Sequence, residues 1–434
     1  MPLPRMLPVR QHFPDRSLPD VPAEALRQLA ARDFASRVPP GARIAIGVGS
    51  RGIANIATIT RATVDYWKSH NARPFIFPAM GSHGGATAEG QADVLAHYGI
   101  HEATMGCPIV SSLDVVPTGR TPEGIETFMD RTAFESDGVM VIGRVKWHTD
   151  FSGKLESGLF KMTAIGLGKF AGAQRYHAYG YKLGLEHVIR TVGRQLLATG
   201  KVLGGLAILE DANHSTGRIA AVPANEMERT DEELLVEVRT WMGRIPMPLD
   251  VLIVDEIGKN ISGSGMDSKV VNRSVHGESN PWPNEHRMER IFIRDLSPHT
   301  YGNAMGVGMA DVVHDRLLAK IDWNATIINS LTAHTPTEIR TPIHFPTDRE
   351  CLERISTVVG RVHPAEVTYG WIKNSMELGF LRLSANLLTQ IQDNPALEIL
   401  GPAEEIECDA EGNFKAFTFP DHVEKSPRTE VLTS

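Results

Sequence analysis

Two histidines directly follow strand-like runs, where side chains can act on a ligand. His83 lies in "MGSHGGAT" after the apolar run 73–80, and His148 lies in "VKWHTD" after the run 136–145. The carboxyl ends of neighbouring parallel strands meet at one edge of a sheet, so both imidazoles could face one ligand. Imidazole titrates near neutral pH, which suits general acid and base catalysis. The alternative is two unrelated surface loops.

A glycine-rich basic segment begins at the second histidine and reads "HTDFSGKLESGLFKMTAIGLGKFAGAQRYH". Lys161 lies in its turn "ESGLFKM", Lys154 and Lys169 lie nearby, and His177 follows sixteen residues after Lys161. A lysine in such a turn could be solvated, bind a phosphate or form a covalent attachment point. A lone histidine is too little for a zinc site built only from protein ligands.

Two further glycine-rich loops could hold a ligand. "GVGSRG" (47–52) has the G-x-G-x-x-G spacing of a dinucleotide-binding turn, and its Arg51 could hold a phosphate or carboxylate. No strand ending in an acid follows at the usual distance of about 20 residues, so another kind of phosphate loop stays open. "EIGKNISGSGMDSKVVNR" (256–273), which includes Lys259, could hold substrate or form a mobile surface loop.

Alternating patterns along the chain predict the elements that position these loops. In the first half, apolar runs predict buried strands and amphipathic runs predict helices. The strands are expected at 42–49, 73–80, 136–145 and 203–211, and the helices at 56–70, 87–99 and 183–200. After two prolines near residue 245, a second series predicts strands at 250–258, 288–296 and 325–332, and helices at 302–322 and 347–362.

This alternation is typical of βαβ units. It predicts two layered α/β domains with mainly parallel sheets, at 1–245 and 246–400, with the active site in the cleft between them. The acidic tail at 401–434 is of uncertain placement, with packing on the N-terminal domain as one option.

Composition narrows the classes of partner. The chain has 434 residues, a formal net charge of −8 and three cysteines. The acidic balance argues against a nucleic-acid partner. Since no signal peptide and no apolar run of about 20 residues is evident, we expect a cytoplasmic protein without a membrane partner.

Together these motifs resemble those of the nickel-pincer-nucleotide-dependent lactate racemase family. The resemblance is carried by Arg51 after the first strand, "GSH" with His83, His148 ahead of "FSG", "SGLFK" with Lys161, and His177. It covers the first half of the chain, whereas the second half matches only in its α/β character.

The resemblance implies a cofactor, a pyridinium-3-thioamide-5-thiocarboxylic acid mononucleotide that carries nickel and is attached covalently to Lys161. His177 would be the protein ligand of nickel, a metal that imidazole suits, and His83 and His148 would be the acid/base pair. The other residues expected to contact the cofactor are Arg51, Ser82, Gly84 and Lys259. The implied partners are cofactor biosynthesis enzymes and a small 2-hydroxy acid, with a homo-oligomer as one option.

The implied reaction inverts the C2 stereocentre of a 2-hydroxy acid by hydride transfer to and from the cofactor. Three departures from the family bear on the substrate: Val48 replaces an acidic residue, the segment between His148 and Lys161 is longer by three residues, and the tyrosine–glutamine–x–x–lysine motif is absent. We therefore expect a larger or more polar acid than lactate. The alternatives are an NAD(P)-dependent oxidoreductase that uses the GVGSRG loop and a non-catalytic α/β binding protein.

Overall fold

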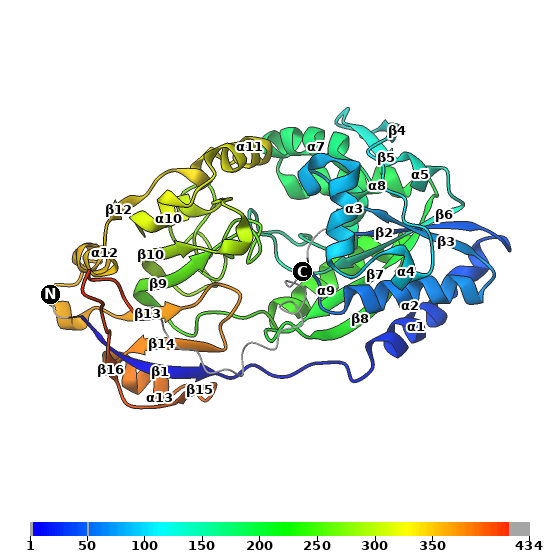
Figure 1. Cartoon of the computed structure of the whole chain (residues 1–434). Coiled ribbons are helices and arrows are strands. Elements are labelled where there is room, and N and C mark those ends of the chain that lie inside the picture. The colour runs from blue at the N-terminus through cyan, green and yellow to red at the C-terminus, as the bar shows by residue number, and fades with distance from the viewer. Residues whose placement is uncertain (1–2, 50–51, 416–434) are drawn as a thin grey trace. The chain divides into compact units, whose positions relative to one another are not determined.

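The computed structural model describes residues 3–49 and 52–415, which divide into two compact α/β units (Figure 1). The first, called the N-unit below, comprises residues 15–49 and 52–242. The second, the C-unit, comprises residues 3–14 and 243–415. Both units are built on sheets whose central strands are parallel, which confirms the predicted fold class.

The N-unit is built on a sheet in which five of the described strands run in the order β3-β2-β6-β7-β8. The first four are parallel, and β8 is antiparallel to β7. The strands are β2 (Arg43–Val48), β3 (Arg73–Pro78), β6 (Gly138–Arg144), β7 (Val202–Glu210) and β8 (Thr216–Pro223). The strands expected at 42–49, 73–80, 136–145 and 203–211 are thus confirmed.

Helices cover both faces of this sheet, because its strands are apolar on both faces. Along β2, Ile44 and Ile46 belong to the core that includes helices α1 and α2, whereas Ala45 belongs to the core that includes α7, α8 and α9. The main helices are α1 (Val21–Arg32), α2 (Ile56–Ser69), α3 (Ala88–His97), α7 (Lys169–Leu183), α8 (Leu185–Leu197) and α9 (Met227–Arg239). Shorter elements are α4 (Glu102–Met105), α5 (Arg131–Phe134), α6 (Leu159–Lys161) and the hairpin of β4 (Val115–Arg120) and β5 (Glu126–Asp130).

The strand order of the N-unit has one topological switch point between β2 and β6. The chain leaves β2 toward β3 on one side and later returns to β6 on the other side. Connections that diverge in this way open a crevice at the carboxyl ends of the two strands, where open α/β sheets bind ligands.

The C-unit holds a nine-stranded sheet within the described residues. The segment from β12 through β11, β10 and β9 to β13 is parallel, and β14, β1, β15 and β16 continue it antiparallel. The strands are β1 (Arg5–Gln11), β9 (Leu249–Ile257), β10 (Met288–Leu296), β11 (Val312–His314), β12 (Ile343–Phe345), β13 (Tyr369–Ile372), β14 (Phe380–Ser384), β15 (Leu397–Ile399) and β16 (Glu404–Glu405). Its helices are α10 (Asp315–Ala319), α11 (Trp323–Ala333), α12 (Asp348–Ile355) and α13 (Leu388–Gln392).

Both ends of the described chain lie in the C-unit. Strand β1, which falls within the range 1–245 predicted for the first domain, pairs with β14 and buries Met6 and Val9. Strand β16, from the predicted tail, pairs with β1. A proline-rich start and an acidic tail carry little periodicity, so their pairing across the whole length of the chain is not visible in the sequence.

Two elements expected in the second half are wrong. The β-branched run at 325–332 lies inside α11, because Asp322 caps that helix by accepting the N–H of Ala325 at 3.0 Å. The helix expected at 302–322 is interrupted by strand β11. Within the described part of the chain, no helix is both long and apolar enough to cross a membrane.

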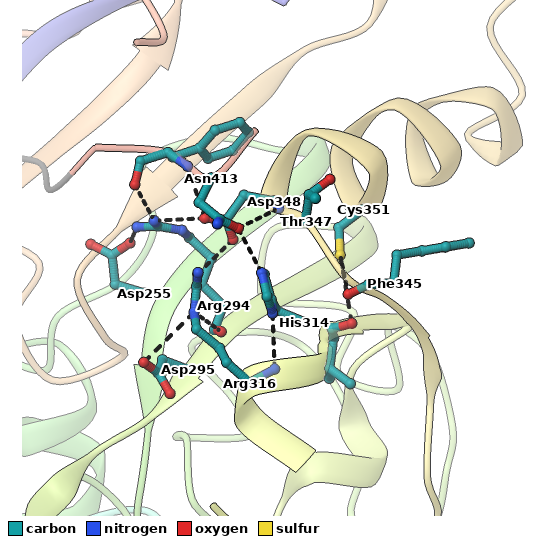
Figure 2. A network of polar contacts seen from close by, with 12 residues as sticks. Asp255, Arg294, Asp295, His314, Arg316, Phe345, Thr347, Asp348, Cys351 and Asn413 are labelled. Carbon is teal, nitrogen blue, oxygen red and sulfur yellow. Dashed lines mark hydrogen bonds and ion pairs between the residues drawn. The ribbon is translucent and has the colours of Figure 1, made fainter. Parts of the chain in front are cut away.

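A buried arginine joins several strands of the C-unit (Figure 2). Arg294 forms ion pairs with Asp255 and Asp348, and its guanidinium lies over the rings of Trp371 and Phe414. Asp348 is fully buried, which raises its pKa, but the neighbouring arginines outweigh that effect and hold the pKa below the ordinary value. The cluster therefore depends on each charge having its partner.

Replacing Arg294 should destabilise the C-unit strongly. Arg294→Ala leaves buried carboxylates without their cation, and the expected loss is about 3–5 kcal/mol in the free energy of unfolding, measured by urea titration. Arg349→Ala is the control on α12, because its pair with Glu353 is exposed and should contribute less than about 1 kcal/mol. Equal effects of the two substitutions would contradict this assignment.

Candidate functional site

The predicted cofactor lysine lies beside the switch point of the N-unit sheet. Its neighbour Met162 packs on Gly49, just after β2, and on Gly143 of β6. A Cβ at Gly49 would lie 3.3 Å from the Met162 sulfur, and one at Gly143 would lie 2.8 Å from its Cγ. The backbone that carries Lys161 thus approaches both strands where only glycine leaves room.

Lys161 ends helix α6, and a π-helical turn over Met162–Gly166 follows. The Leu167 N–H donates to the Met162 carbonyl at 3.1 Å, which closes this wide turn. Such turns are rare and are often found at functional sites.

A buried carboxylate from α9 holds the start of this helix. Asp231 accepts the N–H of Phe160 at 2.7 Å, and a Cβ at Gly158 would lie 2.4 Å from the same carboxylate oxygen. Burial raises the pKa of Asp231 to about 7, and the backbone hydrogen bonds oppose this only in part. A helix N-terminus favours a negative charge, so Asp231 caps the segment that presents Lys161.

His148 lies on the loop that leaves β6, and Lys161 lies in α6, which follows that loop. The loop leaves β6 and closes where Lys146 and Ser157 exchange backbone hydrogen bonds of 3.0 and 3.1 Å. Inside it, the carboxylate of Glu156 is 1% exposed and accepts the N–H of His148. A backbone bond at the neck and a buried carboxylate in the middle therefore define where His148 lies.

Arg239, at the end of α9, secures the same loop. Its guanidinium pairs with Glu156 and donates to the carbonyl of Gly153 at 2.7 Å. From α8, Glu186 accepts the N–H of Leu155 at 3.1 Å. The segment between His148 and Lys161, which is three residues longer than the family pattern, is thus held by side chains from α8 and α9.

The ring of His148 has a defined orientation. Its Nδ1 accepts the N–H of Asp150 at 3.1 Å, and Phe151 stacks on it with ring centroids 4.6 Å apart. Because Nδ1 accepts, the neutral ring carries its proton on Nε2. The hydrogen bond from Asp150 and the stacking of Phe151 thus hold the ring with its donor on Nε2.

His83 lies on the loop after β3, and both Ser82 and His83 are exposed. Gly84 has a φ of +62° and lies against the backbone of Gly90, so a side chain there would be excluded. Thr87 accepts the N–H of Gly90 at 3.0 Å and is the N-cap of α3.

Helix α7 places His177 near the loop that carries His83. A Cβ at Gly81 would lie 2.8 Å from the Cβ of Ala173, so the two backbones are in close contact. His177 follows Ala173 by one helical turn on the same face and is half-buried. The loops after β3 and β6, the Lys161 segment and α7 therefore gather at one edge of the N-unit sheet.

Two further cofactor-contacting residues were predicted, Arg51 and Lys259. Arg51 lies outside the described residues. Lys259 belongs to the C-unit, where it follows β9 and donates to the side-chain oxygen of Asn329 at 2.8 Å. A cleft between the domains as the location of the site stays a prediction.

Three residues of this site, Glu156, Asp231 and Arg239, were not expected from the sequence. Glu156 lies within the quoted segment, but an acid in a glycine-rich loop carries no particular signal. Asp231 and Arg239 lie on α9, which has no motif of its own. They are eight positions apart, about two helical turns, so Asp231 reaches the start of α6 and Arg239 reaches the loop before it.

The side chains near Lys161 and His177 fit a metal that is held mainly by a cofactor. Among residues 3–49 and 52–415, no cluster of three or more His, Cys, Asp or Glu side chains could hold a metal ion. The three cysteines are unpaired with one another, and two are buried. One imidazole on α7 beside a lysine in a glycine-lined crevice could supply one nitrogen ligand and one attachment point.

No family model and no curated protein matches the chain. Among solved structures, it is similar to the lactate racemase apoprotein from Thermoanaerobacterium thermosaccharolyticum. The two share 14% identity with a TM-score of 0.43, over 81% of this chain and 91% of that chain. The roles of the site residues therefore have to rest on their own geometry and chemistry.

Removing the charge of Asp231 should change how stability depends on pH. With its pKa raised to about 7, Asp231 of the folded chain holds a proton that the unfolded chain releases near the ordinary aspartate pKa of 3.8. Between these values wild-type stability should fall relative to Asp231→Asn, by at most about 1.4 kcal/mol per pH unit. Asparagine can still accept the Phe160 N–H, so the capping bond is retained.

The measurement is the free energy of unfolding of both chains at pH 5 and pH 7.5. The control position is Asp137, an exposed carboxylate that accepts the N–H of Arg43. A difference between wild type and Asp231→Asn that does not vary with pH would show that Asp231 does not titrate in this range.

Proposed function

We propose that the chain is a racemase or epimerase that inverts the C2 stereocentre of a 2-hydroxy acid with a nickel-pincer nucleotide attached to Lys161. One observation carries the proposal: Met162 packs on Gly49 and Gly143, which brings the Lys161 segment to the switch point of the sheet. The loops that carry His83 and His148 leave β3 and β6, the strands on either side of β2.

In this proposal Lys161 anchors the cofactor and His177 binds its nickel. The bound cofactor supplies a hydride acceptor and donor for the substrate Cα. The half-buried imidazole on α7 is a suitable nitrogen ligand for Ni(II).

The two remaining histidines would handle the hydroxyl proton. The ring of His148 accepts the Asp150 N–H at Nδ1, so its neutral form carries a proton on Nε2, which suits proton exchange with a substrate oxygen. His83 is exposed on a different loop. Two bases on separate elements can approach opposite faces of a planar 2-keto acid, as inversion requires.

The dinucleotide alternative is less favourable at the GVGSRG loop. Just ahead of α2, the N–H of Ala54 donates at 2.6 Å to Glu210, which pairs with Arg144. A carboxylate therefore already occupies a donor that a pyrophosphate would need, and its charge would repel one.

The substrate is proposed to be larger or more polar than lactate. The support is the loop between His148 and Lys161, whose additional length is braced by Glu156 and Arg239. A rigid longer loop at the edge of the crevice would reshape the pocket without changing the anchor or the nickel ligand.

His177 should be required for nickel but not for attachment of the cofactor. When the chain is produced together with the cofactor biosynthesis enzymes, we expect about one nickel per wild-type chain and a strong loss in His177→Ala. Metal analysis after gel filtration measures this. His187→Ala is the control, because this histidine is exposed on α8 and pairs with Glu123. Full nickel content in His177→Ala would remove the residue from the metal site.

Turnover should proceed without exchange of the Cα hydrogen. We expect the loaded chain to invert at least one member of a panel of 2-hydroxy acids in deuterium oxide without Cα deuterium, because the hydride returns internally. Chiral chromatography with mass spectrometry follows both quantities.

His83→Ala and His148→Ala should retain nickel and lower kcat by at least about 100-fold. The control is His344→Ala, at an exposed position in the C-unit. Unchanged turnover in either variant would remove that histidine from the proton-handling role. In the exchange experiment, deuterium at Cα would indicate simple deprotonation in place of internal hydride return.

A further inference from the structure

A buried lysine of the N-unit has no role in the proposed reaction. Lys169 begins α7 and is 0% exposed. Its φ of +53° lies in the left-handed region, which a non-glycine residue keeps only when its surroundings hold it there. Its Nζ donates to the carbonyl of Pro78 at 2.7 Å and to Oε1 of Gln91 at 2.6 Å.

Gln91 extends this connection to the loop that carries His83. It lies on α3, is fully buried, and its Nε2 donates to the carbonyl of Gly81 at 2.9 Å. Gly81 is two residues before His83 and packs on Ala173 of α7. A continuous chain of hydrogen bonds therefore runs from the start of α7, through α3, to the loop after β3.

The charge of Lys169 is only partly balanced. The carboxylate of Asp130 lies 3.8 Å from Nζ, and both side chains are fully buried. Burial lowers the pKa of Lys169 to about 8, and Asp130 opposes that shift. An apolar side chain of similar length would fill this space without a desolvation penalty. Such a side chain could not form the two hydrogen bonds that Lys169 donates to Pro78 and Gln91.

We infer that Lys169 and Gln91 are positioning residues that hold His83 in register with helix α7, and thereby with His177. Lys169 fixes the start of the helix against the end of β3, and Gln91 fixes the backbone two residues before the histidine. This inference rests on the proposed function for the roles of the two histidines. The hydrogen-bond chain itself can be tested in the protein without cofactor.

Gln91→Glu is the most informative substitution, because it keeps the hydrogen bond from Lys169 and removes the one to Gly81. A glutamate still accepts from Lys169 and neutralises its charge, but it has no N–H for the carbonyl of Gly81. We expect hydrogen exchange at residues 80–87 of the full-length apo protein to become roughly tenfold faster, with the start of α7 unchanged. Lys169→Met should accelerate exchange at both places.

Arg239→Met is the matched control, because it removes a buried contact from the other histidine loop. It should accelerate exchange over residues 147–157 and leave residues 80–87 unchanged. In apo protein labelled with ¹³C at the histidine Cε1, Gln91→Glu should move the His83 signal and leave that of His148 in place. Arg239→Met should have the opposite effect.

Two results would overturn the inference. One is unchanged exchange at residues 80–87 in both Gln91→Glu and Lys169→Met. The other is faster exchange across the whole N-unit, including β6 and β7, which would mean that the pair only stabilises the fold. Neither result depends on the cofactor. If the apo measurements agree but wild-type chains acquire no nickel cofactor, the proposed function fails and the positioning assignment stands.

Discussion

The close approach of Met162 to two strands is the constraint on which the candidate site depends. Gly49 and Gly143 lie at the carboxyl ends of β2 and β6, where the connections of the sheet diverge. A Cβ at Gly143 would clash with Met162, and one at Gly49 would require the end of the Met162 side chain to shift. The sheet and the lysine therefore share one packing contact, and the loops with His83 and His148 are placed relative to it.

Buried polar groups give this arrangement its precision. Asp231 and Arg239 project from α9 to the start of α6 and to the loop that precedes it. Lys169 and Gln91 connect α7 to the loop after β3. In most of these contacts a side chain on a helix binds the backbone of a segment near the site, and Lys169 also binds the side chain of Gln91, so catalytic groups on loops are supported by rigid elements. Burying these charges is unfavourable unless they are paired, which makes the supports sensitive to single substitutions.

The sequence predicts the elements around the site better than it predicts the supports. Apolar runs mark β2, β3 and β6, because strands buried on both faces must be continuously apolar. Asp231 and Phe160 are 71 positions apart, and no local pattern links an acid on one helix to the start of another. In the C-unit, the β-branched run in α11 favours a strand, and only the cap at Asp322 reverses that preference.

The most direct test of the account is the site of covalent attachment. The chain should be produced with and without the cofactor biosynthesis enzymes, digested, and its lysine-containing peptides sequenced by tandem mass spectrometry. The account predicts a modification on Lys161 only in the co-produced protein, with Lys154 and Lys169 unmodified. A chain of bare mass under both conditions, or a modification on another lysine, would contradict it.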